Sequence, residues 1–313
     1  MKLYLAPMEG VTTYHYRRTY EKHFGNIDRY FTPFISNKKM GKRDLDGILP
    51  QNNPRQELIP QIMSNKAEDF LAIAEELSGY GYTIVNLNIG CPSGTVVNKK
   101  RGSGFLAYPK ELEQFLTEIF KYCPLQISIK TRIGVEEEGE WNEILSIYDK
   151  FPMEELIIHP RLRSDFYKNE IRLSAFEQAY EKIRVPLCYN GELNSPEDVK
   201  KIMEKFPKLD RIMIGRGLLR YPYLVNQIRK WEEMQDDFIK EDTGIYKKKL
   251  EDFHDDLYLG YQEIMSGDKN TLFKMKEFWS YFGSSFEGIE KPLKAIKKSE
   301  TLKKYEEAVS MIF

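Results

Sequence analysis

The stretch Ile84-Val85-Asn86-Leu87-Asn88-Ile89-Gly90-Cys91-Pro92 begins as an apolar run and stops abruptly in a glycine and a proline. Such a run is typical of a β-strand that is covered on both faces. A thiol, that of Cys91, follows directly on its end. Seven further short runs rich in β-forming residues recur along the chain, at residues 3–8, 30–35, 58–63, 126–132, 156–159, 186–190 and 211–215.

Amphipathic stretches of helical length separate most of these runs, at residues 67–78, 111–122, 141–150, 175–183 and 196–206. Alternation of strands and helices predicts right-handed βαβ units around a parallel sheet. Eight such units in about 230 residues fit a (β/α)8 TIM barrel, an α/β fold. An open doubly wound sheet is the alternative. It would place a glycine-rich dinucleotide turn after an early strand, whereas the first run here leads into Pro7-Met8-Glu9-Gly10.

The chain changes character at residues 236–244, which are acidic and lack an apolar pattern. After them the β-rich runs disappear, and Leu250, Phe253, Leu257 and Tyr261 follow a three- and four-residue helical spacing. We therefore expect a barrel domain over residues 1–235 and an all-helical domain over residues 236–313.

Composition excludes several classes of protein. The 47 basic and 48 acidic residues leave a formal net charge of −1, so the overall balance indicates no polyanion partner. The three cysteines, Cys91, Cys123 and Cys188, lack the short paired spacing of a disulfide framework or a zinc site. No apolar run reaches about 18 residues. We expect a cytoplasmic protein with no membrane segment and no metal.

Polar residues gather at the expected carboxyl ends of the strands, where barrels carry their catalytic side chains. In strand order they are Glu9, then Gln61, then Asn88 with Cys91, then Lys130 with Arg132, then His159 with Arg161, then Asn190 with Glu192, and finally Arg216. Each also has a purely structural interpretation. Cys91 alone could be a small buried apolar residue, His159 a satisfied core histidine, and Lys130 a side chain extended to solvent.

The joint pattern favours a phosphorylated cofactor. Glycines at 191, 215 and 217 follow the last two strands, where barrels commonly bind phosphate and where glycine lets backbone N–H groups approach it. Arg216 adds a planar set of donors. Lys130 and Gln61 would face the ring of the cofactor and stabilise negative charge on a reduced heterocycle, which suits a flavin.

Basic residues collect on the loops at the same end of the barrel, although solvated loop charge is the simpler reading. They include Lys99, Lys100 and Arg101 after the fourth strand and Arg161 and Arg163 after the sixth. In the helical domain, Lys291, Lys294 and Lys298 would share one helix face. Local basic patches on a chain of near-zero net charge are also typical of contacts with a phosphate backbone.

Several motifs resemble, in order and spacing, those of the tRNA-dihydrouridine synthases. They are Ala6-Pro7-Met8-Glu9-Gly10-Val11, Asn88-Ile89-Gly90-Cys91-Pro92, Lys130-Thr131-Arg132-Ile133-Gly134, His159-Pro160-Arg161, Asn190-Gly191-Glu192 and Ile214-Gly215-Arg216-Gly217. The resemblance implies an FMN-dependent barrel that reduces the C5–C6 double bond of particular uridines in tRNA, with NADPH as reductant. It implies that Cys91 donates a proton to C5 while a hydride goes to C6.

The resemblance also implies roles for individual residues. Flavin-binding positions match Pro7, Met8, Glu9, Gln61, Lys130, His159, Asn190, Gly191, Glu192, Gly215 and Arg216, and positions near the uracil match Asn88 and Arg161. The helical domain is expected to bind tRNA, and the protein to act as a monomer. The loop at residues 162–174 departs from the family pattern. It is expected to touch the substrate, so the target uridine stays open. The rival hypotheses are a flavin barrel that reduces a small molecule, like dihydroorotate or enoate reductases, and a catalytically silent RNA-binding barrel.

Overall fold

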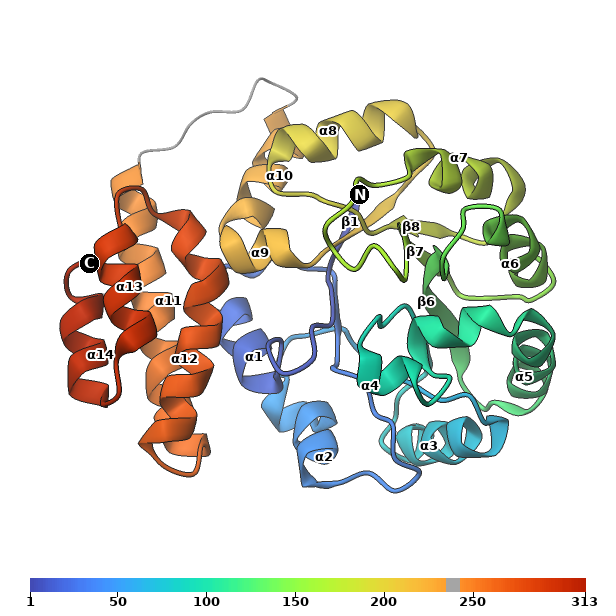
Figure 1. The fold of residues 1–313 in the computed structure, drawn as a ribbon, viewed down its shortest axis with the longest axis horizontal. Coiled ribbons are helices and arrows are strands. Elements are labelled where there is room, and N and C mark those ends of the chain that lie inside the picture. Colours follow the sequence, from blue (N-terminus) through green and yellow to red (C-terminus); the bar gives the residue numbers. More distant parts are fainter. Residues whose placement is uncertain (235–242) are drawn as a thin grey trace.

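The computed structural model describes residues 1–234 and 243–313, so the expected domain boundary at residues 235 and 236 lies outside the described residues. Parallel strands form one sheet in the order β3-β2-β1-β9-β8-β7-β6-β5-β4, with helices around it (Figure 1). The strands are β1 (Lys2–Leu5), β2 (Arg29–Phe31), β3 (Leu58–Ile59), β4 (Gln61–Ile62), β5 (Ile84–Ile89), β6 (Gln126–Gly134), β7 (Leu156–Leu162), β8 (Leu187–Tyr189) and β9 (Arg211–Ile214). The predicted barrel is confirmed.

The ring of strands closes at Pro60. The run at residues 58–63 was expected to be one strand, but it is divided into β3 and β4 because proline has no N–H to give to a ladder. β3 pairs with β2 and β4 with β5. Ile35, which follows β2, donates its N–H to the carbonyl of Gln61 at 2.8 Å and thereby joins the two edges.

The register places the predicted site residues side by side. Asn88 on β5 is opposite Lys130 on β6. Arg132, two residues further along β6, is opposite His159 on β7. Because all these strands are parallel, their carboxyl ends meet at one rim of the barrel.

The interior of the barrel is apolar in its middle and charged at its amino-terminal end. Tyr4, Phe31, Ile157, Cys188 and Met213 form a small cluster of their own, separate from the larger core between the strands and helices.

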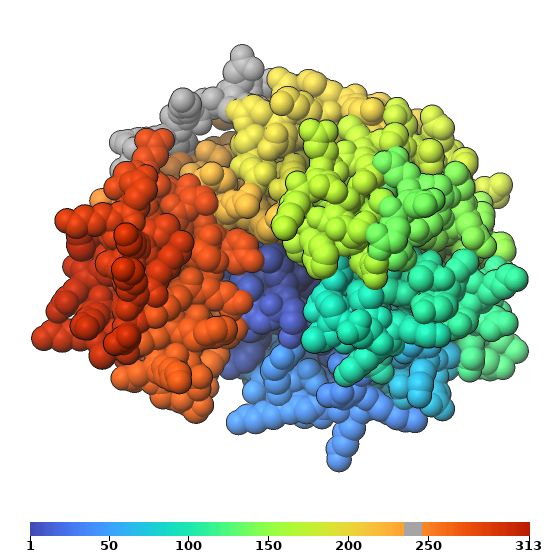
Figure 2. Space-filling model, in the orientation of Figure 1, coloured from blue at the N-terminus to red at the C-terminus, as the bar shows by residue number. Residues whose placement is uncertain are grey.

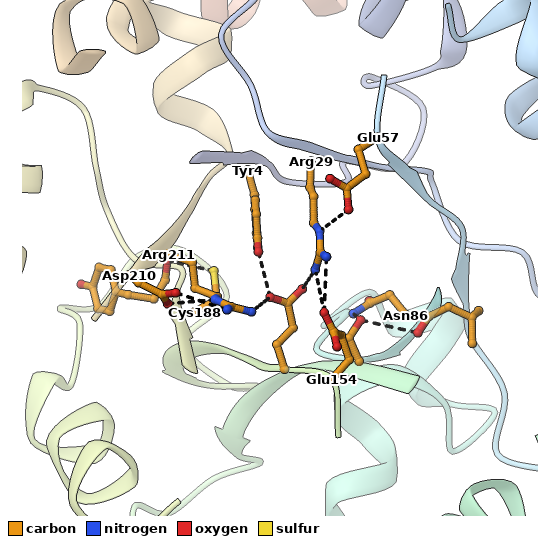
Figure 3. A network of polar contacts seen from close by, with 12 residues as sticks. Tyr4, Arg29, Glu57, Asn86, Glu154, Cys188, Asp210 and Arg211 are labelled. Carbon is orange, nitrogen blue, oxygen red and sulfur yellow. Dashed lines mark hydrogen bonds and ion pairs between the residues drawn. The ribbon is translucent and has the colours of Figure 1, made fainter. Parts of the chain in front are cut away.

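Below this cluster lies a network of polar contacts (Figure 3). Its centre is Glu155, which is fully buried and accepts hydrogen bonds from Arg211 at 3.0 Å and from Tyr4 Oη at 3.0 Å. Arg29 approaches the same carboxylate at 3.4 Å. The two arginines compensate the buried charge and close the floor of the barrel.

Helices surround the strands. They are α1 (Tyr14–His23), α2 (Lys42–Ile48), η1 (Pro50–Asn52), α3 (Ala67–Gly79), α4 (Gly94–Val97), η2 (Gly102–Ala107), α5 (Pro109–Tyr122), α6 (Glu140–Tyr148), α7 (Leu173–Lys182), α8 (Pro196–Lys205), α9 (Arg216–Arg220) and α10 (Leu224–Met234). The five predicted amphipathic stretches are helices α3, α5, α6, α7 and α8. Ser195 begins α8 with a capping box, because its hydroxyl accepts the N–H of Asp198 at 3.2 Å and the Asp198 carboxylate accepts the N–H of Ser195 at 3.1 Å.

The C-terminal helical region, residues 243–313, contains α11 (Thr243–Ile264), α12 (Asp268–Phe282), η3 (Gly283–Ser285), α13 (Glu290–Lys298) and α14 (Leu302–Val309). It packs beside α1 and α9 (Figure 1). The His15 ring of α1 occupies the space that a Cβ atom on Gly260 of α11 would need, and its Nε2 lies 3.1 Å from the carbonyl of Leu257. None of the helices in the described part of the chain is long and apolar enough to cross a membrane.

A candidate active site at the carboxyl end of the barrel

A cavity of about 350 Å³ opens at the carboxyl ends of the strands. The residues that line it are Pro7, Met8, Glu9, Val11, Pro33, Phe34, Gln61, Asn88, Gly90, Cys91, Pro92, Ser93, Lys130, Arg132, His159, Phe166, Tyr167, Glu277 and Tyr281. Figure 2 shows the corresponding hollow, with N-terminal residues in blue at its bottom and orange residues of the C-terminal helical region along one side. The cavity therefore brings together residues from the carboxyl ends of six strands and the loops after them, as the barrel predicts, and it adds two residues of α12.

Cys91 is held in the loop after β5 through its backbone. The Asn88 side-chain oxygen accepts the N–H groups of Gly90 and Cys91, both at 3.0 Å. Ser103 donates its N–H and its hydroxyl to the carbonyl of Cys91 at 3.0 and 2.9 Å. Gly102 makes this approach possible, because it has a φ of +54° and a Cβ atom there would lie 2.7 Å from the same carbonyl oxygen.

The surroundings of the Cys91 thiol favour its protonated form. Burial raises its pKa above the usual value, and the Glu9 carboxylate acts in the same direction. The N–H of Ser93 and the charges of Arg132 and Lys130 oppose this shift only in part. The site therefore favours a proton donor over an activated thiolate nucleophile.

A chain of side-chain amides supports the Cys91 loop from below. Asn88 Nδ2 donates to Gln61 Oε1 at 2.7 Å, and Gln61 Nε2 donates to Asn86 Oδ1 at 2.7 Å. Asn86 in turn donates to Ser128 Oγ at 2.8 Å. Gln61, expected to face a cofactor ring, borders the cavity with its oxygen bound by Asn88 and one amide hydrogen directed at Asn86.

Lys130 extends from β6 into the cavity without a counter-charge. Burial, reinforced by the neighbouring charge of Arg132, lowers the pKa of its ammonium group to about 8. Among the described residues, none forms a hydrogen bond or ion pair with this ammonium. A half-buried cation without a partner among the described residues fits a ligand that brings negative charge.

His159, on β7, is neutral in this setting. Burial and the nearby positive charges of Arg132 and Lys130 hold its pKa well below the usual value. Arg161 Nη1 lies 3.3 Å from His159 Nε2. Because arginine can only donate, Nε2 is the acceptor and the ring proton is on Nδ1.

The five expected cofactor residues after β8 and β9 lie beside the cavity but do not line it. Asn190 Nδ2 donates to the carbonyl of Met213 at 2.8 Å and links the two strand ends. Glu192 binds Arg161 at 2.7 Å and also forms an ion pair with Arg216. The guanidinium of Arg216 lies 4.4 Å from the ring centre of Tyr167, which separates these groups from the cavity.

Of the two glycines expected to bind the cofactor, only Gly191 is at a position that is too crowded for a larger residue. A Cβ atom on Gly191 would overlap the Tyr189 ring, whereas one on Gly215 would reach only ordinary contact distance, 3.4 Å from Ala6 Cβ. Together with the arginine forks and the unpartnered Lys130, this donor set fits an anionic, phosphorylated cofactor.

The residues expected to contact RNA differ in how exposed they are and in whether they have a partner. Lys99 and Lys100 are exposed in the loop after β5, where Lys100 Nζ lies 4.1 Å from the ring centre of Tyr108. Arg101 is tied to the carbonyl of Ser36 at 3.3 Å. Arg161 is buried, with 4% of its side chain exposed, and Arg163 is paired with Glu136.

In the C-terminal helical region the lysines of α13 behave as the sequence suggested. Lys291, Lys294 and Lys298 are exposed, while Pro292 and Ile296 are buried on the opposite face. None of the three lines the cavity.

The sequence analysis gave no site role to Pro33, Phe34, Ser93, Glu277 or Tyr281, which also line the cavity. Phe166 and Tyr167 belong to the divergent loop at residues 162–174. Arg132 was located at a strand end but given no role. It donates to the carbonyls of Gly90 at 3.0 Å and Leu162 at 2.7 Å, so it joins the Cys91 loop to the end of β7. No group of histidine, cysteine, aspartate or glutamate side chains that could hold a metal occurs within residues 1–234 and 243–313.

Comparison with known proteins gives a consistent result. The family model described as dihydrouridine synthase (Dus) matches residues 4–307. A tRNA-dihydrouridine synthase B from Pasteurella multocida is 27% identical over 225 residues, which cover 71% of this chain and 67% of the relative. A probable tRNA-dihydrouridine synthase 2 from Bacillus subtilis is 27% identical over 266 residues, with 78% and 81% covered.

Solved structures with the same fold include morphinone reductase, with a TM-score of 0.51, 10% identity, and coverage of 77% of this chain and 87% of that one. An old yellow enzyme homologue from Zymomonas mobilis has a TM-score of 0.50 and 10% identity, with 77% and 90% covered. At this identity the likeness shows the barrel fold alone.

Proposed function

Because this chain belongs to the dihydrouridine synthase family, we propose that it reduces the C5–C6 double bond of specific uridines in tRNA to 5,6-dihydrouridine. The names of the relatives support tRNA as the substrate. The observation that carries the proposal is that Cys91, Lys130 and His159 line one cavity in a chain that matches the family model almost from end to end.

The proposed cofactor is FMN, which NADPH would reduce. When bound, the reduced FMN would supply a hydride to C6 of the uracil. Lys130 and the neutral His159 would hold the ring, with Pro7, Met8, Glu9 and Gln61 around it. Asn190, Gly191, Glu192, Gly215 and Arg216 would surround the phosphate. The unpartnered charge of Lys130 supports this assignment, since it would compensate negative charge on the ring.

Cys91 is proposed as the proton donor to C5. Hydride addition at C6 places negative charge at C5 and O4, and a positioned acid removes this charge by delivering a proton. The raised pKa of the Cys91 thiol supports this role, because the donor must be protonated before each turnover. Asn88 fixes the loop that carries the thiol and would lie next to the uracil.

The target base must leave the folded RNA to reach a cavity at the end of a barrel. Lys99, Lys100, Arg101 and Arg163 would contact the RNA backbone at the rim, and Lys291, Lys294 and Lys298 would contact it on α13. The buried Arg161 would act mainly by orienting His159 and Glu192.

The proposal is tested by mapping dihydrouridine in tRNA from cells with and without this protein. Loss of dihydrouridine at particular positions, restored by the wild-type gene, is the expected result. A complete dihydrouridine pattern in cells without the protein, together with purified protein that binds no flavin, would reject both the substrate and the cofactor.

A further inference from the structure

A second cavity, of about 530 Å³, lies between the barrel and the C-terminal helical region. The barrel contributes residues of the loop before α1, of the loop after β2, and of α2, and the helical region contributes Ile264, Met265 and Lys274. It is larger than the cavity that contains Cys91. No role assigned above uses it.

The two cavities are neighbours that share a wall. Pro33 lines both. The rest of the wall includes two ion pairs, each with one partner in each cavity: Glu9 faces Cys91 and binds Arg43 of the second cavity at 2.5 Å, and Glu277 binds Lys274 at 2.9 Å. Lys274 also donates to the carbonyl of Gly10 at 2.8 Å.

The lining of the second cavity combines an aromatic and apolar surface with cations. The aromatic and apolar surface comes from Tyr14, Pro33, Ile35 and Met265. The cations are Lys42, Arg43 and Lys274. Two acidic residues, Asp44 and Asp46, line the same cavity. Asp44 is used locally, since it accepts the N–H of Gly41 at 3.1 Å. Lys42 is exposed and has no hydrogen bond or ion pair with any described residue.

We propose that the second cavity binds the nucleotide next to the target uridine in the RNA chain. This inference rests on the proposed function. A uridine in the first cavity stays joined to its neighbours through phosphodiesters, so the adjacent nucleotides lie close to the mouth of this cavity, and the second cavity is directly beyond the shared wall. Tyr14 provides a face on which any base can stack, and the three cations surround the place where its phosphate would pass.

The ion pair between Arg43 and Glu9 suits this passage. Both side chains are well exposed, at 68% and 37%, and exposed pairs contribute little to stability. The planar guanidinium can therefore move from the carboxylate to a phosphate at small cost, and phosphate is the ligand that its fork fits best.

The test fills the second cavity without touching the first. Gly47 of α2 lines the second cavity, and a Cβ atom at this position meets no atom within 4 Å. Gly47→Trp is expected to weaken binding of unmodified tRNA about tenfold or more, and to raise KM for tRNA similarly. Flavin content and the rate of flavin reduction by NADPH should stay as in the wild type.

Gly79→Trp is the matched control, because Gly79 also lies in a helix and also faces open space, yet lines neither cavity. It should leave tRNA affinity unchanged. Lys42→Glu is a second, independent variant, expected to weaken tRNA binding and to reduce its dependence on salt. A transcript that lacks the base next to the mapped uridine should bind the wild-type protein more weakly than the intact transcript does. The Gly47→Trp protein should bind the two transcripts equally well.

Equal tRNA affinities for the wild type, Gly47→Trp and Lys42→Glu would overturn the second-cavity proposal and leave the proposed function intact. Wild-type protein that binds tRNA but forms no dihydrouridine would instead overturn the proposed function. In that case the affinities of the variants still decide whether RNA occupies the second cavity.

Discussion

The side-chain oxygen of Asn88 accepts the backbone N–H of Cys91 at 3.0 Å, so the last part of β5 determines how the thiol leaves the strand. The same side chain donates to Gln61 on the neighbouring strand. A residue that the sequence placed beside the substrate is therefore also the support of the proposed proton donor.

Replacing Asn88 by Ala should lower kcat for dihydrouridine formation by about tenfold or more, because a displaced acid transfers its proton less efficiently. Flavin content should stay unchanged. Steady-state kinetics with tRNA provides the measurement, and Asn142→Ala, at an exposed position on α6, is the control. An unchanged kcat would mean that the Cys91 loop holds its position without this bond.

Cys91→Ala should reduce dihydrouridine formation by about 10²-fold or more while flavin remains bound and reducible, since only the proton donor is lost. Product analysis on tRNA and the flavin spectrum give the two readouts. Cys123→Ala, which alters a thiol outside the cavity, should behave as the wild type. Full turnover by the Cys91 variant would remove the proposed acid.

Lys130→Met should stabilise the flavin-free protein at pH 7 by about 1–3 kcal/mol. The pKa of Lys130 falls from 10.5 in the unfolded chain to about 8 in the folded one, so folding opposes its charge most below pH 8. The difference between variant and wild type should shrink as pH rises from 8 to 10.5. Urea unfolding at pH 7 and pH 10 measures it.

The same variant should bind flavin more weakly, because it lacks the cation that is proposed to face the flavin ring. In the wild type, flavin affinity should fall as pH rises through about 8 and the ammonium group loses its proton. Titrations of flavin fluorescence across this range test both statements. An affinity that does not change with pH would show that Lys130 is not in contact with the flavin.

Glu155→Ala should cost about 3–5 kcal/mol of stability, because two arginines at the floor of the barrel would lose their buried counter-charge. Glu154→Ala is the matched control, since Glu154 is 25% exposed and also pairs with Arg29. It should cost less than about 1 kcal/mol. Chemical unfolding of both variants distinguishes a structural floor from a set of ordinary surface pairs.

Gly260→Ala should destabilise the protein by about 1–3 kcal/mol, although alanine is the better helix former, because the new Cβ atom would overlap the His15 ring. His15→Ala combined with Gly260→Ala should cost less than the two single changes summed. Gly79→Ala, in open space, is the control. Strictly additive costs would mean that the ring and the glycine do not interact.

Much of the barrel could be predicted because most of its strands coincide with a short apolar run in the sequence. The run at residues 84–89 is a strand over these same residues, as β5. The prediction of a single strand at residues 58–63 was wrong, since Pro60 interrupts the hydrogen-bond ladder there and divides the run into β3 and β4. The run at residues 30–35 is shortened to β2, and its end returns only as the single bridge from Ile35 to Ile62.

The site was predictable as far as it follows from the barrel. Cys91, Lys130 and His159 end adjacent strands, so a general rule about parallel strands brings them together. Glu277 and Tyr281 follow no such rule, because they are on α12, whose docking depends on contacts between distant parts of the chain, such as that of Lys274 with the carbonyl of Gly10. Tyr167 lies in a loop with no periodic pattern that could place it.

The position of α12 against the cavity bears on how such a protein can change through evolution. One wall of the cavity that contains Cys91 belongs to the part of the chain that is expected to bind the RNA. Replacing the C-terminal helical region by that of a relative would therefore alter the lining of the cavity as well as the binding of RNA. A change of target RNA that replaces residues of the helical region would therefore also have to preserve the wall that α12 gives to this cavity.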